Sequence, residues 1–165
     1  MERFKTRRVE ERQGAGNRDH DFPEIDPKVK EGILNFFHGD NQERFNTHLG
    51  MKLVDIREGY SRMELETTRK VCQPADIMHG GASFGLADAA VALALVALFG
   101  PGKLLLTIEM KINYLEPIPL GSTATAEAYV LRASRSSAYA EVDIWAAGKL
   151  AARCTTTYMI RDRAK

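Results

Sequence analysis

The residues of this sequence most suited to chemistry gather around one glycine-rich turn. Residues 79–81 read His-Gly-Gly, Gln73 precedes the histidine by six positions, and Asp88 follows it by nine. Two adjacent glycines let the backbone turn sharply and approach a ligand closely. An amide, an imidazole, backbone N–H groups and a carboxylate together suit a reaction at a carbonyl group.

A helix that begins at this turn would present unpaired N–H groups and the positive end of its dipole, and both favour negative charge. The N–H of Gly80 or of Gly81 could then stabilise the oxyanion that develops on a thioester or ester carbonyl. Asp88 lies about two turns further along, among apolar neighbours, where it could act as nucleophile or general base. The alternative for Asp88 is a buried carboxylate tied to backbone donors.

Three other residues near the turn leave more than one role open. His79 is expected to hold the loop through a hydrogen bond, with proton transfer as the alternative. Ser83 could contact the substrate or cap the helix. Cys72 could form a thiol triad with His79 and Asp88, although a place in the wall of the site suits it better. The spacing of the four histidines predicts no metal site: His20, His38, His48 and His79.

A long apolar segment must position these groups. Between residues 82 and 99 the only polar side chains are Ser83 and Asp88. A helix that is apolar on every face has to be surrounded by protein or lipid. A membrane span needs about 20 apolar residues, and this run is shorter and contains a carboxylate. The segment therefore predicts a buried central helix, which ends at the Gly-Pro-Gly of residues 100–102.

The flanking sequence supplies a sheet to wrap this helix. Apolar residues alternate with polar ones before the turn and in four stretches after residue 102, with hairpin-length connections between the last three. Rows of alanine on the inward faces leave room for a helix. These patterns predict an α+β fold in which an antiparallel sheet of five or six strands curls around one long helix. The clearest strand places one apolar row on a single face: Leu104, Leu106, Ile108, Met110, Ile112 and Tyr114.

Length and composition predict one domain over residues 26–165, preceded by a mobile arm over residues 1–25. Asp26 and Pro27 resemble a helix N-cap and first position. The net charge of +1 gives no reason to expect nucleic acid or an anionic membrane as partner. Two distant cysteines and the lack of an apolar leader suggest reduced thiols and a cytoplasmic location.

The pattern formed by Gln73, His79, Gly80, Gly81 and Asp88 resembles that of the hotdog-fold acyl-CoA thioesterases, and HGGASFGLAD is similar to the segment typical of the PaaI type. The strand TIEMKINYLEPIPLGS is also similar to that family's strand after the helix. The resemblance covers roughly residues 45–161.

This resemblance implies hydrolysis of an acyl-CoA or aryl-acyl-CoA thioester to the free acid and coenzyme A, without a cofactor or metal. Asp88 would be the nucleophile or general base, and Gly80 would donate its N–H to the thioester carbonyl. Gln73 would help to orient the carbonyl or water, although PaaI-type members more often have Asn there and Gly in place of Asp76. The family also implies a homodimer or dimer of dimers with the site built across two subunits, and coenzyme A phosphates near two arginines of a hairpin: Arg132 and Arg135.

Two other functions remain open. A hotdog-fold enoyl-CoA hydratase or dehydratase would use a catalytic histidine, but usually with the carboxylate at a different spacing. A non-enzymatic acyl-CoA-binding module would use the same pocket to sense its ligand. Independently of the family, a single sheet wrapped on a helix leaves an exposed edge strand, which predicts at least a homodimer with a continuous sheet.

Overall fold

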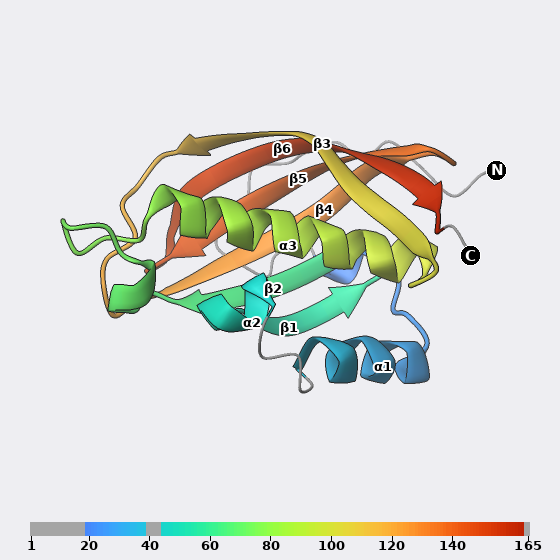
Figure 1. Ribbon diagram of the computed structural model, residues 1–165, viewed down its shortest axis with the longest axis horizontal. Coiled ribbons are helices and arrows are strands. Elements are labelled where there is room, and N and C mark those ends of the chain that lie inside the picture. The colour runs from blue at the N-terminus through green and yellow to red at the C-terminus, as the bar shows by residue number, and fades with distance from the viewer. Residues whose placement is uncertain (1–18, 39–43, 164–165) are drawn as a thin grey trace.

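The computed structural model describes residues 19–38 and 44–163, which fold as one antiparallel sheet curled around a long helix (Figure 1). The strands of the sheet are β1 (Lys52–Arg57), β2 (Tyr60–Glu66), β3 (Lys103–Tyr114), β4 (Thr123–Ala133), β5 (Ser137–Ala146) and β6 (Lys149–Asp162). The helices are α1 (Pro27–His38), α2 (Phe45–Leu49) and α3 (Gly80–Phe99), with 3-10 turns η1 (Asp19–Asp21) and η2 (Arg69–Val71). The strands lie in the order β1-β2-β4-β5-β6-β3.

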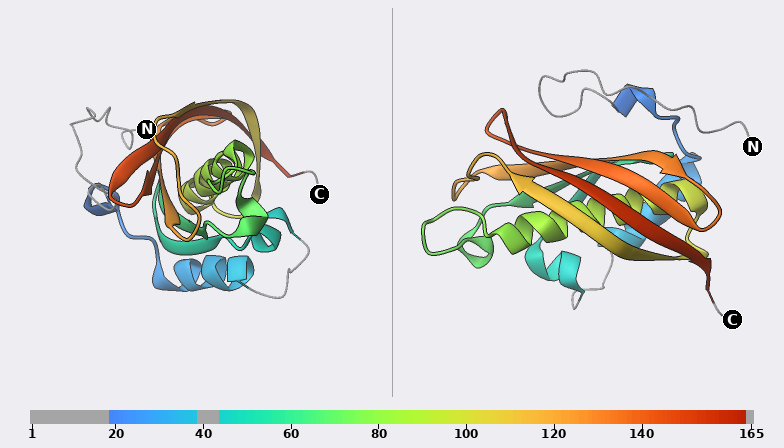
Figure 2. Two further views of the ribbon diagram at one scale, coloured as in Figure 1. Left: turned by 90° about the vertical axis from the view of Figure 1, so that its left-hand side faces the viewer. Right: turned by 90° about the horizontal axis from the view of Figure 1, so that it is seen from above.

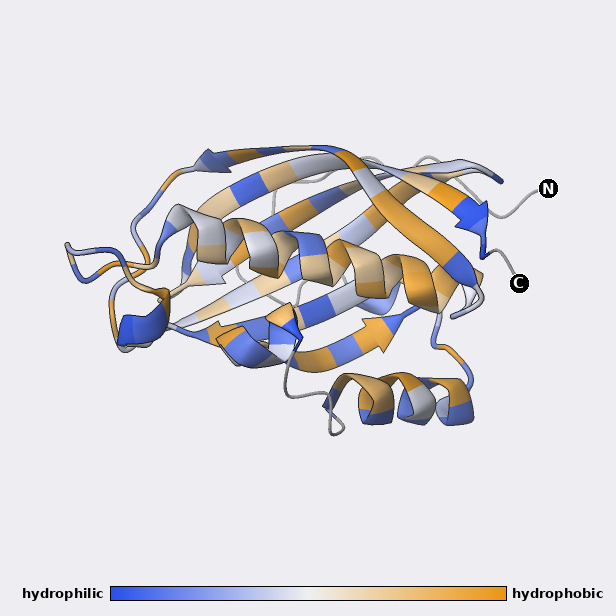
Figure 3. Ribbon diagram, viewed as in Figure 1, coloured by the Kyte–Doolittle hydropathy of each residue, from blue (hydrophilic) through white to orange (hydrophobic). Residues whose placement is uncertain are grey.

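The helix α3 is the core of the molecule. It is mostly apolar, with a hydrophilic stretch near its middle (Figure 3), and the view along its axis shows the sheet closing around it (Figure 2). By length and composition α3 could also cross a membrane, but strands β1 to β5 contact it and most of its residues are buried. Ala124, Ala126 and Ala128 of β4 are fully buried. The predicted α+β architecture and the alanine rows that make room for the helix are confirmed.

Strand β3 differs from the single apolar face that the sequence predicts. Its register with β6 shifts around Ile108, which forms a β-bulge. Before the bulge, Leu105 and Thr107 face α3, whereas after it Met110 does. The extra residue reverses the alternation of side chains. The prediction that one face holds the whole row is therefore wrong: Leu104, Leu106 and Ile108 are exposed, and Met110 and Ile112 pack against the core.

Strand β3 is also an edge of the sheet, because β6 is its only neighbour in the described chain. Leu104 and Leu106 are each 39% exposed, and Ile108 is 61% exposed. A long edge with free backbone groups and apolar side chains is a template for pairing with another strand. On the outer face of the sheet, Tyr139 is 39% exposed and Trp145 only 8%.

The segment before β1 packs along the sheet. Asp26 caps α1 as predicted, since its carboxylate accepts hydrogen bonds from the N–H groups of Lys28 at 2.9 Å and Val29 at 3.3 Å. Part of the expected mobile arm is described, and there the Phe22 ring stacks on Tyr60 with the ring centroids 5.5 Å apart. Residues 1–18 of that arm lie outside the described residues.

A group of ion pairs joins this segment to β1. The Asp55 carboxylate accepts hydrogen bonds from Lys30 Nζ at 2.7 Å and Arg57 Nε at 3.0 Å, and Arg57 also pairs with Glu24 at 3.0 Å. Burial disfavours the charged form of Asp55, but the hydrogen bonds from Lys30 and Arg57 outweigh it and hold the pKa of Asp55 below its ordinary value. The ionised carboxylate therefore stabilises the fold.

Replacing Asp55 by Asn should lower the free energy of unfolding by about 1–3 kcal/mol at pH 7, because hydrogen bonds to charged groups contribute at this level. Since the pKa of Asp55 is lowered by folding, its contribution is fully present above about pH 4 and is lost as the pH falls further. Urea unfolding between pH 3 and pH 8 measures both effects.

The control is Asp162→Asn, which removes a carboxylate that pairs with Lys103 but is 78% exposed. Exposed ion pairs contribute little, so this variant should unfold like the parent. An equal loss of stability in both variants, or a loss in Asp55→Asn that does not shrink at low pH, would contradict the role given to Asp55.

Candidate active site

The His-Gly-Gly turn is anchored on both sides by backbone hydrogen bonds. The N–H of His79 donates to the carbonyl of Val71 at 2.8 Å, and the N–H of Met78 donates to that of Ile118 at 2.8 Å. These bonds tie the start of α3 to the turn η2 and to the loop between β3 and β4. The first turn of the helix is therefore held in a fixed position.

The side chain of His79 caps α3. Its Nδ1 accepts a hydrogen bond from the N–H of Gly81 at 2.9 Å, which places the proton of the neutral ring on Nε2. The carbonyl of His79 accepts from the N–H of Ala82 at 2.9 Å. Among the described residues, the N–H of Gly80 has no acceptor. Of the two N–H donors that the sequence left open, Gly80 is thus the one available to a ligand.

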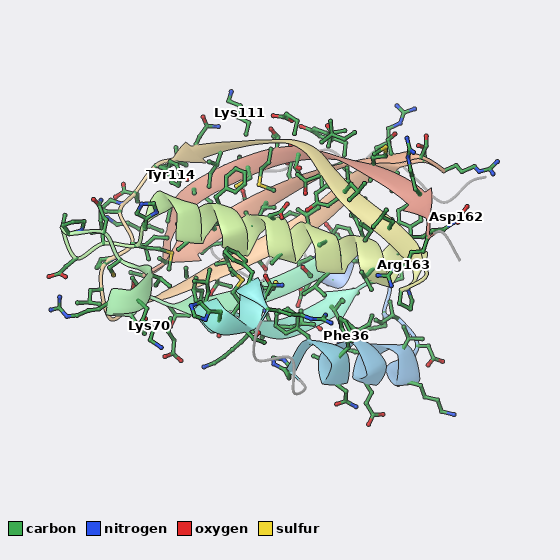
Figure 4. All side chains as sticks on the ribbon, viewed as in Figure 1. Phe36, Lys70, Lys111, Tyr114, Asp162 and Arg163 are labelled. Carbon is green, nitrogen blue, oxygen red and sulfur yellow. The ribbon has the colours of Figure 1, made fainter. Side chains whose placement is uncertain are left out.

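Tyr114, at the end of β3, is a neighbour of this donor that the sequence analysis missed as a site residue. Its hydroxyl donates to the carbonyl of Gly80 at 2.8 Å, and it lies beside the first turn of α3 (Figure 4). A Cβ at Gly80 would lie 3.0 Å from the Tyr114 hydroxyl and 3.1 Å from the ring carbon that carries it. An added Cβ would therefore push the Tyr114 hydroxyl back by a few tenths of an ångström, so that glycine serves a close approach here and not an unusual backbone angle.

Gln73 begins the tight turn that precedes His79. Its carbonyl accepts from the N–H of Asp76 at 3.1 Å, and its side-chain amide has no hydrogen-bond partner in the part of the chain that is described. Asp76 has a φ of +55°, a left-handed conformation that Gly adopts readily and that Asp tolerates better than most residues. This explains how Asp can stand where similar sequences more often have Gly.

Asp88 is half-buried in the middle of α3 and accepts hydrogen bonds from two side chains of the sheet. Thr107 of β3 donates to its Oδ1 at 2.7 Å, and Tyr158 of β6 donates to the same oxygen at 2.5 Å. The sequence placed Asp88 among apolar neighbours or backbone donors. Its partners are instead two hydroxyl groups, which no local sequence pattern revealed.

Other predicted site residues lie apart from these groups. Gly80 and Asp88 are eight positions apart on one helix, which separates them by about 12 Å. The start of β4 pairs with the end of β2 near η2, so Arg132 and Arg135 at its far end lie about 30 Å from the turn. Ser83 is buried in the first turn of α3. Within one chain, the predicted site residues therefore do not form a single cluster.

Neither a thiol triad nor a metal centre is supported by the contacts. The Nδ1 of His79 is occupied by Gly81, and no hydrogen bond joins Cys72 to His79 or Asp88 in the described residues. Within residues 19–38 and 44–163, no three His, Cys, Asp or Glu side chains gather as metal ligands would. The groups available for chemistry are the N–H of Gly80, the amide of Gln73 and the carboxylate of Asp88.

The chain is similar to known proteins over the part that contains the His-Gly-Gly turn and α3. Residues 75–152 match the family model described as "Thioesterase superfamily". The chain is 35% identical to the 1,4-dihydroxy-2-naphthoyl-CoA hydrolase of Listeria monocytogenes over 48% of this chain and 66% of that protein. It is 33% identical to the 1,4-dihydroxy-2-naphthoyl-CoA thioesterase 2 of Arabidopsis thaliana over 52% of this chain and 54% of that protein. The chain covers between 50% and 66% of the length of the first curated relatives that it matches.

The structure is similar to that of a variant of the phenylacetic acid degradation protein PaaI from Thermus thermophilus. The two share a TM-score of 0.65 and 27% sequence identity, over 70% of this chain and 96% of that one. The two proteins therefore share the fold over most of the chain.

The capping role of His79 can be tested through stability. Replacing His79 by Ala removes the acceptor for the N–H of Gly81 and should lower the free energy of unfolding by about 1 kcal/mol. Replacing His79 by Asn should restore most of this loss, because Asn is a favoured N-cap residue. Denaturant unfolding of the three proteins measures the difference. An equal loss in both variants would contradict the capping role.

Proposed function

Because the chain carries a thioesterase-superfamily domain with the hotdog fold, we propose that this protein hydrolyses acyl-CoA thioesters to the free acid and coenzyme A. The observation that carries the proposal is the pair of groups on α3: a free N–H at Gly80 and a half-buried carboxylate at Asp88. A polarised carbonyl and a nearby base or nucleophile are the two requirements for cleaving a thioester.

The groups would divide the reaction between them. The N–H of Gly80 donates to the thioester oxygen and stabilises the negative charge that develops there. Asp88, as general base, takes a proton from the water that attacks the carbonyl carbon; the C–S bond then breaks and the sulfur leaves as the thiol of coenzyme A. As nucleophile, Asp88 would itself attack and form an anhydride that water later opens. Gln73 orients the carbonyl or the water, and His79 holds the turn.

The distance along α3 supports a site shared between two copies of the chain. A single carbonyl carbon cannot touch Gly80 and Asp88 of one helix when about 12 Å separate them. Both groups nevertheless lie against the exposed edge strand β3, Asp88 at Thr107 and Gly80 at Tyr114. Antiparallel pairing of two β3 strands about residues 110–111 would set Thr107 of each copy opposite Tyr114 of the other. A homodimer of this kind, alone or as half of a dimer of dimers, would bring Asp88 close to the second copy's turn.

In the dimer formed by pairing of two β3 strands, the arginines of the β4–β5 hairpin would also have a role in binding. Asp162, which pairs with Lys103 at the start of β3, also feels the charge of Arg135. The hairpin therefore lies at the end of β3 that would face the turn of the second copy. Arg132 and Arg135 would then be placed to bind coenzyme A phosphates, for which guanidinium groups are well suited.

The names of the relatives guide the choice of substrate. Two of them are named for the hydrolysis of 1,4-dihydroxy-2-naphthoyl-CoA, so an aryl acyl group is the first to test. The purified protein should release thiol from at least one member of a panel of short, medium and aryl acyl-CoAs, detected with a thiol reagent. Absence of thiol release from every member would refute the proposal, and hydration of an enoyl-CoA would favour a hydratase instead.

Asp88→Asn should lower kcat by about a hundredfold or more while changing KM little, because it removes a base or nucleophile and keeps the shape of the side chain. Steady-state kinetics on the best acyl-CoA measure both constants. Glu31→Gln, at an exposed position of α1, is the control and should match the parent. Near-normal turnover in Asp88→Asn would show that another group acts as base or nucleophile.

The shared site makes a separate prediction for mixed dimers. Gly80→Ala should also lower kcat by about a hundredfold, because the added Cβ crowds Tyr114 and disturbs the N–H donor. A purified heterodimer of Asp88→Asn and Gly80→Ala chains would contain one site with both groups intact. It should therefore recover about half the activity of the parent dimer, as each parent dimer would have two such sites.

Two outcomes would contradict the arrangement. A heterodimer with no more activity than the Asp88→Asn and Gly80→Ala homodimers would show that one chain supplies both groups of a site. A compact monomer with full activity, measured by light scattering at assay concentration, would remove the need for a partner. Gly32→Ala in α1, where a new Cβ meets no other atom within 4 Å, is the control for the substitution itself.

A further inference from the structure

The contacts of Asp88 are uneven between its two oxygens. Oδ1 accepts the hydroxyl hydrogens of both Thr107 and Tyr158, at 2.7 Å and 2.5 Å. Oδ2 has no hydrogen-bond partner among the described residues. An ionised carboxylate can accept several hydrogen bonds at each oxygen. One oxygen is thus held by the sheet, and the other is left for a further partner.

Tyr158 reaches Asp88 from a strand 70 positions away in the sequence. It lies directly opposite Thr107 in the β3–β6 pairing, just before the bulge at Ile108. The hydroxyl of Thr156 donates to the carbonyl of Glu109, the residue after the bulge, at 2.6 Å. The bulge is therefore supported from β6, the same strand that carries Tyr158.

Among the described residues, the hydroxyls of Thr107 and Tyr158 are the only groups that hydrogen-bond to the carboxylate of Asp88. In the part of the chain that is described, no lysine, arginine or histidine hydrogen-bonds or ion-pairs with this carboxylate. The titratable side chains of β6 that face α3 are Tyr158 and Cys154, while the helix-facing side of β3 near Asp88 presents Thr107 and Met110. No cation from these strands offsets the negative charge.

Tyr158 is suited to be a permanent donor. It is 2% exposed. Burial, the negative charge of Asp88 and their hydrogen bond all raise the pKa of Tyr158 far above its ordinary value. Burial, and to a lesser degree Asp143, raises the pKa of Cys154 to about 12. Both groups therefore stay neutral at any pH at which the protein works, and the phenol keeps the proton that it donates.

We propose that Tyr158 is a positioning residue for Asp88: it holds Oδ1 and leaves Oδ2 as the oxygen that meets the reacting atom. This rests on the proposed thioester hydrolysis for its catalytic meaning. Two donors on one oxygen fix the plane of the carboxylate, so that Oδ2 points in one direction.

The kinetic test is Tyr158→Phe, which removes the hydroxyl and keeps the ring. We expect kcat at neutral pH to fall about tenfold with KM within a factor of two, as part of the hundredfold or more that the base itself contributes. The matched control is Tyr139→Phe, on the outer face of β5, which should keep the parent's kcat and KM. An unchanged kcat in Tyr158→Phe, or a loss that appears equally in KM, would overturn the proposal, since a positioning residue affects the reacting oxygen and not substrate binding.

A second test does not depend on turnover. In protein labelled with carboxyl-¹³C aspartate, the signal of Asp88 is assigned by its absence in Asp88→Asn. At neutral pH its chemical shift in Tyr158→Phe should differ from the value shared by the parent and Tyr139→Phe, because the carboxylate loses one hydrogen bond. A changed signal in a protein that cleaves no acyl-CoA would refute the proposed function and keep the contact, whereas an unchanged signal refutes the role of Tyr158.

If Tyr158→Phe does not fold, the parent itself gives the answer. A short hydroxyl–carboxylate bond should show a slowly exchanging hydroxyl proton far downfield in its NMR spectrum, and this signal should move upfield in Asp88→Asn. Absence of such a proton in the parent would overturn the proposal.

Discussion

The structure depends on burying a helix that has no polar face. The 20 residues of α3 are apolar on every side, so the sheet must curl around them and line its inner surface with small side chains such as Ala126 and Ala128. Any polar group on that helix then needs a partner from the sheet. Ser61 of β2 donates to the carbonyl of Ala90 at 2.6 Å, and the carboxylate of Asp88 receives two hydroxyls. Because α3 is buried, the strands packed around it determine which side chains can hydrogen-bond to Asp88.

The same helix sets the spacing of the candidate site. An α-helix is rigid, so residues eight positions apart stay about 12 Å apart whatever the sheet does. Gly80 and Asp88 both contact the edge strand β3, through Tyr114 and Thr107. In the proposed dimer, a second copy pairing with this edge would complete the site. Assembly and chemistry would then depend on one strand, and a change on the edge of β3 would affect both.

Much of this could be predicted from the sequence, because its signals are local. The apolar run predicts the central helix, period-two alternation predicts the strands, and Asp26 before Pro27 predicts the start of α1. The bulge at Ile108 could not be predicted, since one extra residue in an apolar strand looks like a longer alternation. Nor could Tyr158, whose contact with Asp88 depends on the register of β6 against a helix 70 positions earlier. Sequence patterns indicate candidate residues, and the pairing of distant strands determines which side chains contact them.

The glycine-rich turn shows how the two kinds of information combine. From the sequence, Gly80 and Gly81 were equivalent donors at a helix N-terminus. The fold separates them, because the imidazole of His79 takes the N–H of Gly81 and leaves that of Gly80. Tyr114 donates to the carbonyl of Gly80 and lies so close that an added Cβ would have to displace its hydroxyl. The tertiary contacts of His79 and Tyr114 therefore distinguish two glycines that are equivalent in the sequence.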